Sequence, residues 1–365
     1  LQCLLFASPS SGCSLTDIQC QCQSTDLIYA TATCMLGNCT MSDTLDTAKW
    51  QASLCDVPKE SKSRRVSPAC NIVFALSCSC FLLRLSAKFL SKRLSYDDYF
   101  VAGAMVFASI AFGTITEMIR QGAGKHIWDL EHGQLKNALR MFYISGNAYQ
   151  ISLGLVKMSL VALYLQIFQT RKMRWACYAL FIFIAISTTA IALATIFSCT
   201  PVPFFWNRDM EGKCVNLTAL GFANSALAIA QDVFIILVPI PKLHTLHMKL
   251  WRKVAVGLMF TLGAGGCVAT IIRLRSVYQL KVSIDPTWDY SELIIWTAVE
   301  LTVVALLASL PSMRIFLSII LIKIKAKDSS NESQTFESTL ENMDIALVQI
   351  PGRTWQPGRD SRGEP

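Results

Sequence analysis

Seven apolar runs, each about as long as a membrane-spanning helix, follow one another after residue 68. They lie near 69–87, 99–120, 139–168, 175–198, 217–240, 254–278 and 291–321. A helix needs about 20 apolar residues to cross the hydrocarbon core at ~1.5 Å per residue. The runs are continuous rather than alternating, which favours helices over barrel strands. The pattern predicts an all-α bundle of seven transmembrane helices, the first of which is the weakest because Arg84 interrupts it.

Polar segments flank this bundle, which we assign to residues 69–322. Residues 1–57 are polar, small and rich in cysteine, and they are too few to bury a core that holds by itself. Residues 58–68 form a charged linker. Residues 323–365 are rich in Ser, Pro, Gly and charge, so we expect a disordered tail.

Composition agrees with a membrane protein. Only 16% of residues are charged and the mean hydropathy is +0.42, whereas soluble domains carry about 25% charged residues. The net charge of +8 comes from short loops between apolar runs, and no zinc-finger spacing, P-loop or basic arm indicates nucleic-acid binding.

The distribution of basic residues predicts the orientation. Four loops (88–95, 169–175, 241–253 and 322–328) hold 3, 3, 4 and 3 Lys and Arg residues. The other three loops (121–136, 199–215 and 279–287) hold 2, 2 and 1. Basic residues favour the cytoplasm, so the first set is inside, the N-terminus is outside and the C-terminal tail is cytoplasmic.

Cysteines give the same orientation independently. Seven of the 14 precede residue 56, which indicates a disulfide framework in an oxidising compartment. Seven is odd and the chain begins at Leu1 without an initiator Met, so we expect an eighth cysteine upstream of a truncated or processed start. Cys199 and Cys214 flank a predicted outer loop and are expected to form a disulfide there, two free thiols being the alternative.

Glycosylation sequons begin at Asn38 and Asn216 on the predicted outer side. Each sequon also occurs by chance, since the pattern is common. A third sequon, at Asn331, falls on the predicted inner side and should be silent.

Four charged residues lie inside four different apolar runs: Lys157, Asp232, Arg273 and Glu300. An unpaired charge in lipid costs several kcal/mol, so these side chains should face the bundle interior and pair. Lys157 and Asp232 lie about 16 and 12 Å from the inner ends of their runs, and Arg273 and Glu300 roughly 9 and 13 Å from the outer ends. Depth therefore predicts the ion pairs Lys157–Asp232 and Arg273–Glu300. Each pair is either a polar switch coupled to a ligand or a structural clamp.

No arrangement of Ser, His and Asp or of Cys and His indicates catalysis, so we do not expect an enzyme. His244 and His247 could share a helix face and hold a metal, but no carboxylate or cysteine lies near them in the sequence. Surface histidines beside Lys and Arg are the simpler interpretation. The basic inner loops have two candidate partners, anionic lipid head groups and an acidic signalling protein such as a heterotrimeric G protein.

The N-terminal cysteine pattern resembles the CFEM module of fungal extracellular membrane proteins. The motif runs from Cys13 through Asp17 to Cys20 and Cys22, followed by Cys34, Cys39 and Cys55. The resemblance implies the pairings Cys13–Cys20, Cys22–Cys55 and Cys3–Cys34, with Cys39 bonded to a cysteine that would precede Leu1.

The same resemblance implies haem, because CFEM members that take up iron bind haem through an aspartate at the position of Asp17. A carboxylate is a hard ligand and suits ferric iron. The alternative role for Asp17 is that of an N-cap for a helix beginning near Ile18. Both roles are compatible.

The bundle resembles the fungal rhodopsin-like integral membrane family over residues 84–320. The motifs that carry the resemblance are Ser95-Tyr96-Asp97-Asp98-Tyr99, Gly122 to Leu130, Gly154 to Leu160, Cys199 to Val202, Trp206, Gly212-Lys213-Cys214, Gln231-Asp232, Pro239-Ile240-Pro241, Asp285 to Trp288 and Glu300. It implies a receptor-like seven-helix protein.

A retinal Schiff base needs a desolvated lysine, which retinal proteins carry on the seventh helix. Because 291–321 contains no lysine, we expect no retinal.

Three functions compete at this point. The first is a plasma-membrane receptor that senses an extracellular ligand, and the second is a membrane-anchored haem or iron capture protein. The third is a transporter, which the buried charges favour and the lack of an internal repeat disfavours.

Overall fold

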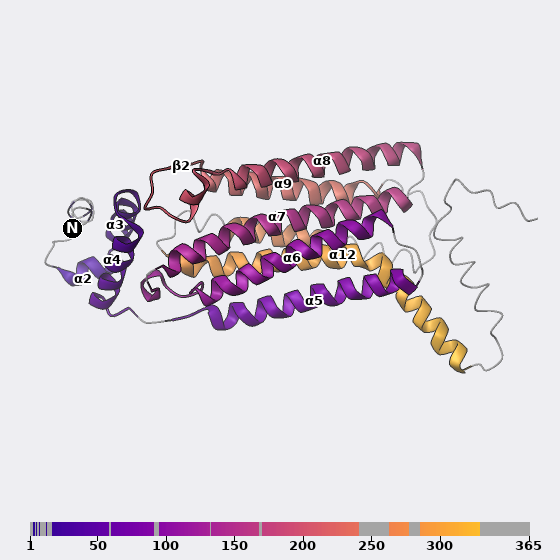
Figure 1. The fold of residues 1–365 in the computed structure, drawn as a ribbon, viewed down its shortest axis with the longest axis horizontal. Coiled ribbons are helices and arrows are strands. Elements are labelled where there is room, and N and C mark those ends of the chain that lie inside the picture. Colours follow the sequence, from indigo (N-terminus) through magenta and orange to yellow (C-terminus); the bar gives the residue numbers. More distant parts are fainter. Residues whose placement is uncertain are drawn as a thin grey trace, which may run out of the picture.

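The computed structural model describes residues 3, 5, 7, 12, 17–57, 60–90, 95–131, 133–167, 170–240, 263–276 and 285–328. Its N-terminal module consists of α2 (Ile18–Gln23), α3 (Thr25–Asn38) and α4 (Met41–Leu54). The bundle consists of α5 (Ser63–Leu90), α6 (Tyr96–Arg120), α7 (Gln134–Ile167), α8 (Arg171–Ile196), α9 (Leu217–Leu237), the helical segment 263–276 and α12 (Pro286–Asp328). In Figure 1 the long helices run side by side, and the module lies at one end of them.

Two short elements shape the loops at the module end of the bundle. The 3-10 helix η1 (Ile127–Asp129) lies between α6 and α7, and η2 (Val202–Phe205) lies between α8 and α9. Strands β1 (Cys199–Thr200) and β2 (Lys213–Cys214) pair antiparallel, with Cys199 opposite Cys214. This register brings the two cysteines together and closes the loop around η2.

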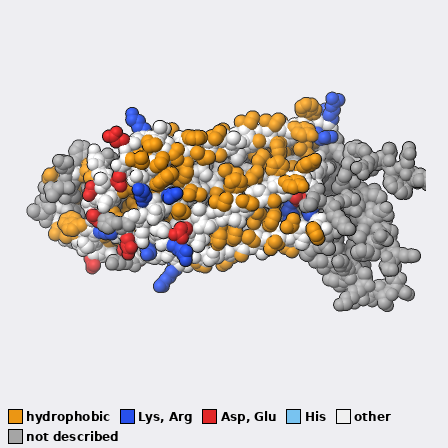
Figure 2. All heavy atoms as spheres, viewed as in Figure 1, with side chains coloured by type: hydrophobic (Ala, Val, Ile, Leu, Met, Phe, Trp, Pro, Cys, Tyr) orange, Lys and Arg blue, Asp and Glu red, His pale blue; other side chains and the backbone are white. Residues whose placement is uncertain are grey.

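Five helices in the described part of the chain are long and apolar enough to cross a membrane. Their spans are Ser63–Ser86, Tyr96–Arg120, Gln134–Gln166, Arg171–Ile196 and Leu217–Leu237. The helical segment 263–276 and α12 overlap the sixth and seventh apolar runs. The chain is therefore a multi-pass helical protein, and the count of seven spans stays a prediction. Figure 2 shows hydrophobic side chains spread over the middle of the bundle surface.

Two boundaries differ from those expected. Helix α5 begins at Ser63, inside the expected linker, because Arg64 and Arg65 extend the helix on the polar side of the apolar run. Helix α12 continues to Asp328, so the first residues of the expected disordered tail are helical. Residues 329–365 lie outside the described part.

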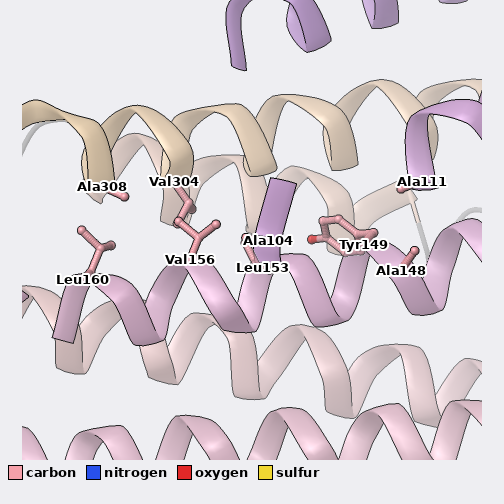
Figure 3. Close-up of a cluster of buried hydrophobic side chains, with 9 residues drawn as sticks. All are labelled: Ala104, Ala111, Ala148, Tyr149, Leu153, Val156, Leu160, Val304 and Ala308. Carbon is pink, nitrogen blue, oxygen red and sulfur yellow. The ribbon is translucent and has the colours of Figure 1, made fainter. Parts of the chain in front are cut away.

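Helix α7 forms the centre of the bundle. Of its most apolar stretch 72% is buried, against 22–33% for the other four spans. Tyr149, Leu153, Val156 and Leu160 recur every three or four residues and so share one face of α7. They pack against small residues of α6 and α12, as Figure 3 shows: Ala104, Ala111, Val304 and Ala308. Small side chains let helices approach closely where lipid offers no hydrophobic driving force.

Candidate functional site

The N-terminal module is held by disulfides, in keeping with its small core. Cys3 bonds to Cys34 and Cys22 to Cys55, with Cα–Cα distances of 5.6 and 5.5 Å. Cys20 is also in a disulfide, while Cys13, its expected partner, lies outside the described residues. Cys39 is an exposed free thiol in the structure.

Asp17 begins α2 as its N-cap. Its Oδ1 accepts a hydrogen bond from the backbone N–H of Cys20 at 3.0 Å. The carboxylate is exposed, and the neighbouring Ile18 is 48% exposed although it is apolar. Asp17 therefore has a structural role, while its exposed carboxylate beside an apolar side chain still fits a haem ligand.

Helix α4 packs on the loop that carries η1. Leu45 of α4 is 2% exposed and contacts Ile127 and Leu130, which are buried as well. A second contact reaches the loop between η2 and β2, where Asp209 Oδ1 accepts the backbone N–H of Met41 at 2.7 Å. The module is thus docked on the bundle through apolar and polar contacts, rather than only tethered to it.

Next to this docking site, His126 joins the η1 loop to the start of α12. Its Nδ1 lies 2.6 Å from Oδ2 of Asp285, and its ring is stacked between Trp128 and Trp288 at centroid distances of 4.5 and 4.0 Å. Asp285 Oδ1 accepts the backbone N–H of Ile127 at 3.1 Å. A displacement of the η1 loop would therefore act directly on the first turn of α12.

The first intramembrane ion pair joins α7 to α9. Lys157 is completely buried, and its Nζ lies 2.8 Å from Oδ1 of Asp232. The same Nζ donates to the backbone carbonyl of Ala228 at 3.0 Å. These contacts satisfy the ammonium group inside the bundle, where burial of an unpaired charge would cost several kcal/mol.

The second ion pair joins the segment 263–276 to α12. Arg273 Nε lies 2.9 Å from Oε2 of Glu300, a residue with no exposed surface. The hydroxyl groups of Tyr149 and Thr270 donate to the same carboxylate at 2.6 and 2.8 Å. The Arg273 guanidinium also lies 5.6 Å from the centroid of the Tyr149 ring. Glu300 of α12 is therefore the acceptor at which α7 and the segment 263–276 converge.

We call these six residues the mid-membrane cluster: Tyr149, Lys157, Asp232, Thr270, Arg273 and Glu300. The two pairs are linked through α7, which carries both Lys157 and the Tyr149 that donates to Glu300. Within the described residues, Asp232 Oδ2 and the Nε and Nη2 atoms of Arg273 are buried without a hydrogen bond, so the approach of Nε to Glu300 is an ion-pair contact only. The cluster therefore holds unused hydrogen-bonding atoms on groups of opposite charge.

A second charged cluster lies at the bundle end opposite the module, and the sequence analysis did not identify it. Arg84 binds Asp97 and Asp98 and donates to the backbone carbonyl of Ala308. Lys88 Nζ lies 3.3 Å from Asp98 Oδ2. We call Arg84, Lys88, Asp97 and Asp98 the distal cluster. The sequence feature that indicates this cluster is a basic residue, Arg84, inside one apolar run, followed by two acidic residues, Asp97 and Asp98, just before the next apolar run.

The expected glycosylation sites are both exposed. Asn216 is the N-cap of α9, and its Oδ1 accepts the backbone N–H of Ala219 at 3.0 Å. Asn38 lies in the last turn of α3.

His244 and His247, the candidate metal ligands, lie outside the described residues. Among the residues that are described, no group of three or more His, Cys, Asp and Glu side chains could hold a metal ion.

Comparison with known families gives two matches. The fungal rhodopsin domain matches residues 83–319, and the CFEM domain matches residues 1–56. No solved structure matches the chain.

Curated relatives match part of the chain. It is 26% identical over 234 residues to the polyenoic acids biosynthesis gene cluster protein Ba17b of Metarhizium anisopliae, a match that covers 60% of this chain and 64% of the relative. It is 26% identical over 235 residues to a SAT4 family membrane protein of Emericella nidulans, covering 61% and 60%. It is 23% identical over 223 residues to the receptor GIN3 of Arthrobotrys oligospora, covering 60% and 54%. The chain thus spans about six tenths of the length of the curated relatives it matches.

Proposed function

Because the chain belongs to the fungal rhodopsin domain family and carries a CFEM domain at its N-terminal end, we propose that it is a plasma-membrane receptor. In this proposal the CFEM module lies outside the cell and detects a ligand, and the mid-membrane cluster responds. One relative is named a receptor, which supports the same class of function.

The docking of α4 on the η1 loop is the observation that carries the proposal. Leu45 contacts Ile127, and the adjacent His126 is bonded to Asp285 at the start of α12. Helix α12 also carries Glu300, 15 residues further along the chain. A module that served only as a ligand trap would gain nothing from contacts that lead into the bundle. Coupling along this route is tested by releasing the module and following the start of α12.

Hydrogen exchange on the full chain in nanodiscs provides that test. Leu45→Asp places a charge at a buried apolar contact and should release the module, since burial of a leucine contributes about 1.5–3 kcal/mol. We expect faster deuterium uptake in residues 286–300 of this variant. Trp50→Asp is the matched control, because Trp50 lies on the same helix and is 62% exposed.

Equal uptake in the two variants would contradict coupling between the module and α12. Loss of signal in all helices would indicate unfolding instead, so the melting temperature of each variant is measured in parallel.

The intracellular partner in this proposal is a heterotrimeric G protein. Three basic residues at the start of α8, Arg171, Lys172 and Arg174, are exposed at the bundle end opposite the module. An acidic protein surface or anionic lipid would complement them. Charge reversal at Arg171 and Lys172 should weaken capture of the purified G protein in nanodiscs of neutral lipid, where the lipid contribution is absent.

Haem capture is the second candidate function, favoured by the exposed carboxylate of Asp17 beside the exposed Ile18. If haem binds there, its ferric iron would take Asp17 as an oxygen ligand. Asp17→Asn separates ligation from capping, because Asn is as good an N-cap as Asp but lacks the anionic oxygen. A Soret shift of the full chain with ferric haem that Asp17→Asn abolishes, at unchanged stability, would support capture. A shift that persists in Asp17→Asn would exclude ligation by this residue.

A further inference from the structure

An elongated apolar crevice lies between α5 and α6, with α7 and α12 behind it. Its walls include Phe74 and Phe81 of α5, Met105 and Ala108 of α6, and Ala305 of α12. Phe74 stacks on Phe112 of α6 at a centroid distance of 4.0 Å, so these two half-buried rings bridge the walls of the crevice at one point. Phe81 and Met105 are half-buried as well, so the crevice has a side that faces outward.

The length of the crevice follows from the helices that line it. On α6 the lining residues run from Val101 to Ile115, which corresponds to ~21 Å at a helical rise of 1.5 Å per residue. The crevice runs parallel to the spans. One leaflet of a bilayer contributes about 15 Å of a hydrocarbon core that is ~30 Å thick. The crevice is therefore long enough to take one extended acyl chain.

The chemistry of the walls also favours a hydrocarbon chain. Six hydroxyl-bearing residues line the crevice, and all except Thr297 have a hydrogen-bond partner in the described part of the protein. Ser77 bonds Thr302 at 2.9 Å, and Ser152 donates to the carbonyl of Ala104 at 2.8 Å. Tyr149 donates to Glu300 at 2.6 Å. An occupant therefore meets aliphatic and aromatic surface with few open hydrogen-bonding positions.

The ends of the crevice indicate where the chain comes from. Ser309 lines one end, and next to it the carbonyl of Ala308 accepts from Arg84. Arg84 is 2% exposed and already binds Asp97 and Asp98, so it is not available to a carboxylate head group. A free fatty acid would have to bury or expose its carboxylate without that partner. A phospholipid instead leaves its head group at the membrane surface while one chain enters sideways.

We propose that this crevice is a binding site for one acyl chain of a bilayer phospholipid. The bound chain would contact Tyr149, which lines the crevice and donates to Glu300 of the mid-membrane cluster. The site does not depend on the CFEM module or on receptor activity.

Photolabelling of the full chain in nanodiscs tests the site directly. The probe is a phosphatidylcholine with a diazirine in the middle of one acyl chain, and the labelled residues are mapped by mass spectrometry. We expect labels on the crevice faces of α5 and α6, around Phe74 and Met105. A phosphatidylcholine with the diazirine on the head group should not label these positions.

A substitution that fills the crevice should displace the chain. Ala108 is 5% exposed and lines the crevice, so Ala108→Phe should reduce labelling at Phe74 and Met105 roughly tenfold, equivalent to about 1.4 kcal/mol. Val106→Phe is the matched control, since Val106 lies on the same helix and is 60% exposed. If Ala108→Phe does not fold, Ala305→Leu fills the same space from α12.

Three results would overturn the proposal. The first is equal labelling at Phe74 and Met105 in Ala108→Phe and Val106→Phe, which would mean that the probe samples only the outer surface. The second is the absence of label on the crevice faces. The third is labelling by a diazirine fatty acid but not by the phospholipid, which would assign the crevice to a free acid.

Discussion

The mid-membrane cluster and the distal cluster both bury opposite charges, but they differ in how completely their atoms are bonded. In the distal cluster, Arg84 uses Nε and both Nη atoms on two carboxylates and a carbonyl. In the mid-membrane cluster, Asp232 Oδ2 and the Nε and Nη2 atoms of Arg273 make no hydrogen bond among the described residues. A fully bonded polar network specifies one rigid arrangement, whereas a partly bonded network specifies its arrangement less strictly. This comparison suggests a clamp at the distal end and a switch in the middle.

The number of residues between bonded partners along the chain also differs between the two clusters. Arg84 and Asp97 are separated by 13 residues and lie at the junction of two consecutive helices. Lys157 and Asp232 come from α7 and α9, and Arg273 and Glu300 from segment 263–276 and α12. The ion pairs of the distal cluster therefore join two consecutive helices, and uncharged partners on α12 and α7, Ala308 and Gln166, complete that cluster. In the mid-membrane cluster the charged partners themselves come from four helices, so a relative movement of those helices would act on the ion pairs directly.

The largest effect is expected for Glu300→Ala. This change leaves the guanidinium of Arg273 buried without a carboxylate, and breaking a buried pair in this way costs about 3–5 kcal/mol. We expect a large drop in the melting temperature of the protein in detergent. Glu292→Ala on the same helix is the control, because Glu292 is exposed. A similar melting temperature for the two variants would mean that Glu300 is not the main partner of Arg273.

A smaller effect is expected for Asp97→Asn in the distal cluster. Asp97 has no exposed surface, accepts from Arg84, and accepts from Gln166 at 2.8 Å. Arg84 keeps Asp98 as a partner, so the loss should be near that of charged hydrogen bonds, about 1.5–3 kcal/mol.

A double-mutant cycle with Leu45→Asp then separates clamp from switch. If the distal cluster is a clamp far from the coupling route, Asp97→Asn and Leu45→Asp should add within ~0.5 kcal/mol. Strong non-additivity would place the distal cluster on the route and remove the distinction between the two clusters.

Much of this arrangement could be predicted from the sequence, and the failures have physical causes. The depth of a charge along its helix can be counted from a fixed rise per residue. Depth therefore predicts partners for Lys157 and Glu300, and the structure places these side chains beside those partners. The Cys199–Cys214 disulfide followed from the length of the loop and the predicted side of the membrane. Both arguments use only positions and separations along the sequence.

Contacts between separate segments could not be predicted in this way. Arg84 looked like a defect in an apolar run, because nothing local shows that α5 and α6 bring it to Asp97. The stacking of His126 between Trp128 and Trp288 combines a loop with the start of α12. The docking of Leu45 on Ile127 joins two domains. Such contacts depend on the tertiary packing of elements that are distant in sequence.

The smallest change in stability is expected where both charges of one pair are replaced together. Lys157→Met combined with Asp232→Leu removes the ammonium and the carboxylate and fills their place with apolar side chains. Replacement of a whole buried ion pair is often neutral or stabilising by ~1–4 kcal/mol, whereas each single change leaves one charge unpaired. We therefore expect both single variants to reach the cell surface poorly and the double variant to reach it as well as the wild type. The reversed pair, Lys157→Asp with Asp232→Lys, should also restore surface expression over either single change.

Signalling by the double variant then decides between the two roles of the pair. If Lys157 and Asp232 only clamp α7 to α9, apolar packing can replace them, and G-protein capture should match the wild type. If the pair is part of a switch, the protein should fold but lose any dependence of that capture on the docked module. The readout is the ratio of capture with Leu45→Asp to capture without it, measured in the wild-type and in the double-variant background. A ratio that is the same in both backgrounds would make the mid-membrane pair a clamp like the distal one, and the unused atoms of Asp232 and Arg273 would then have no signalling role.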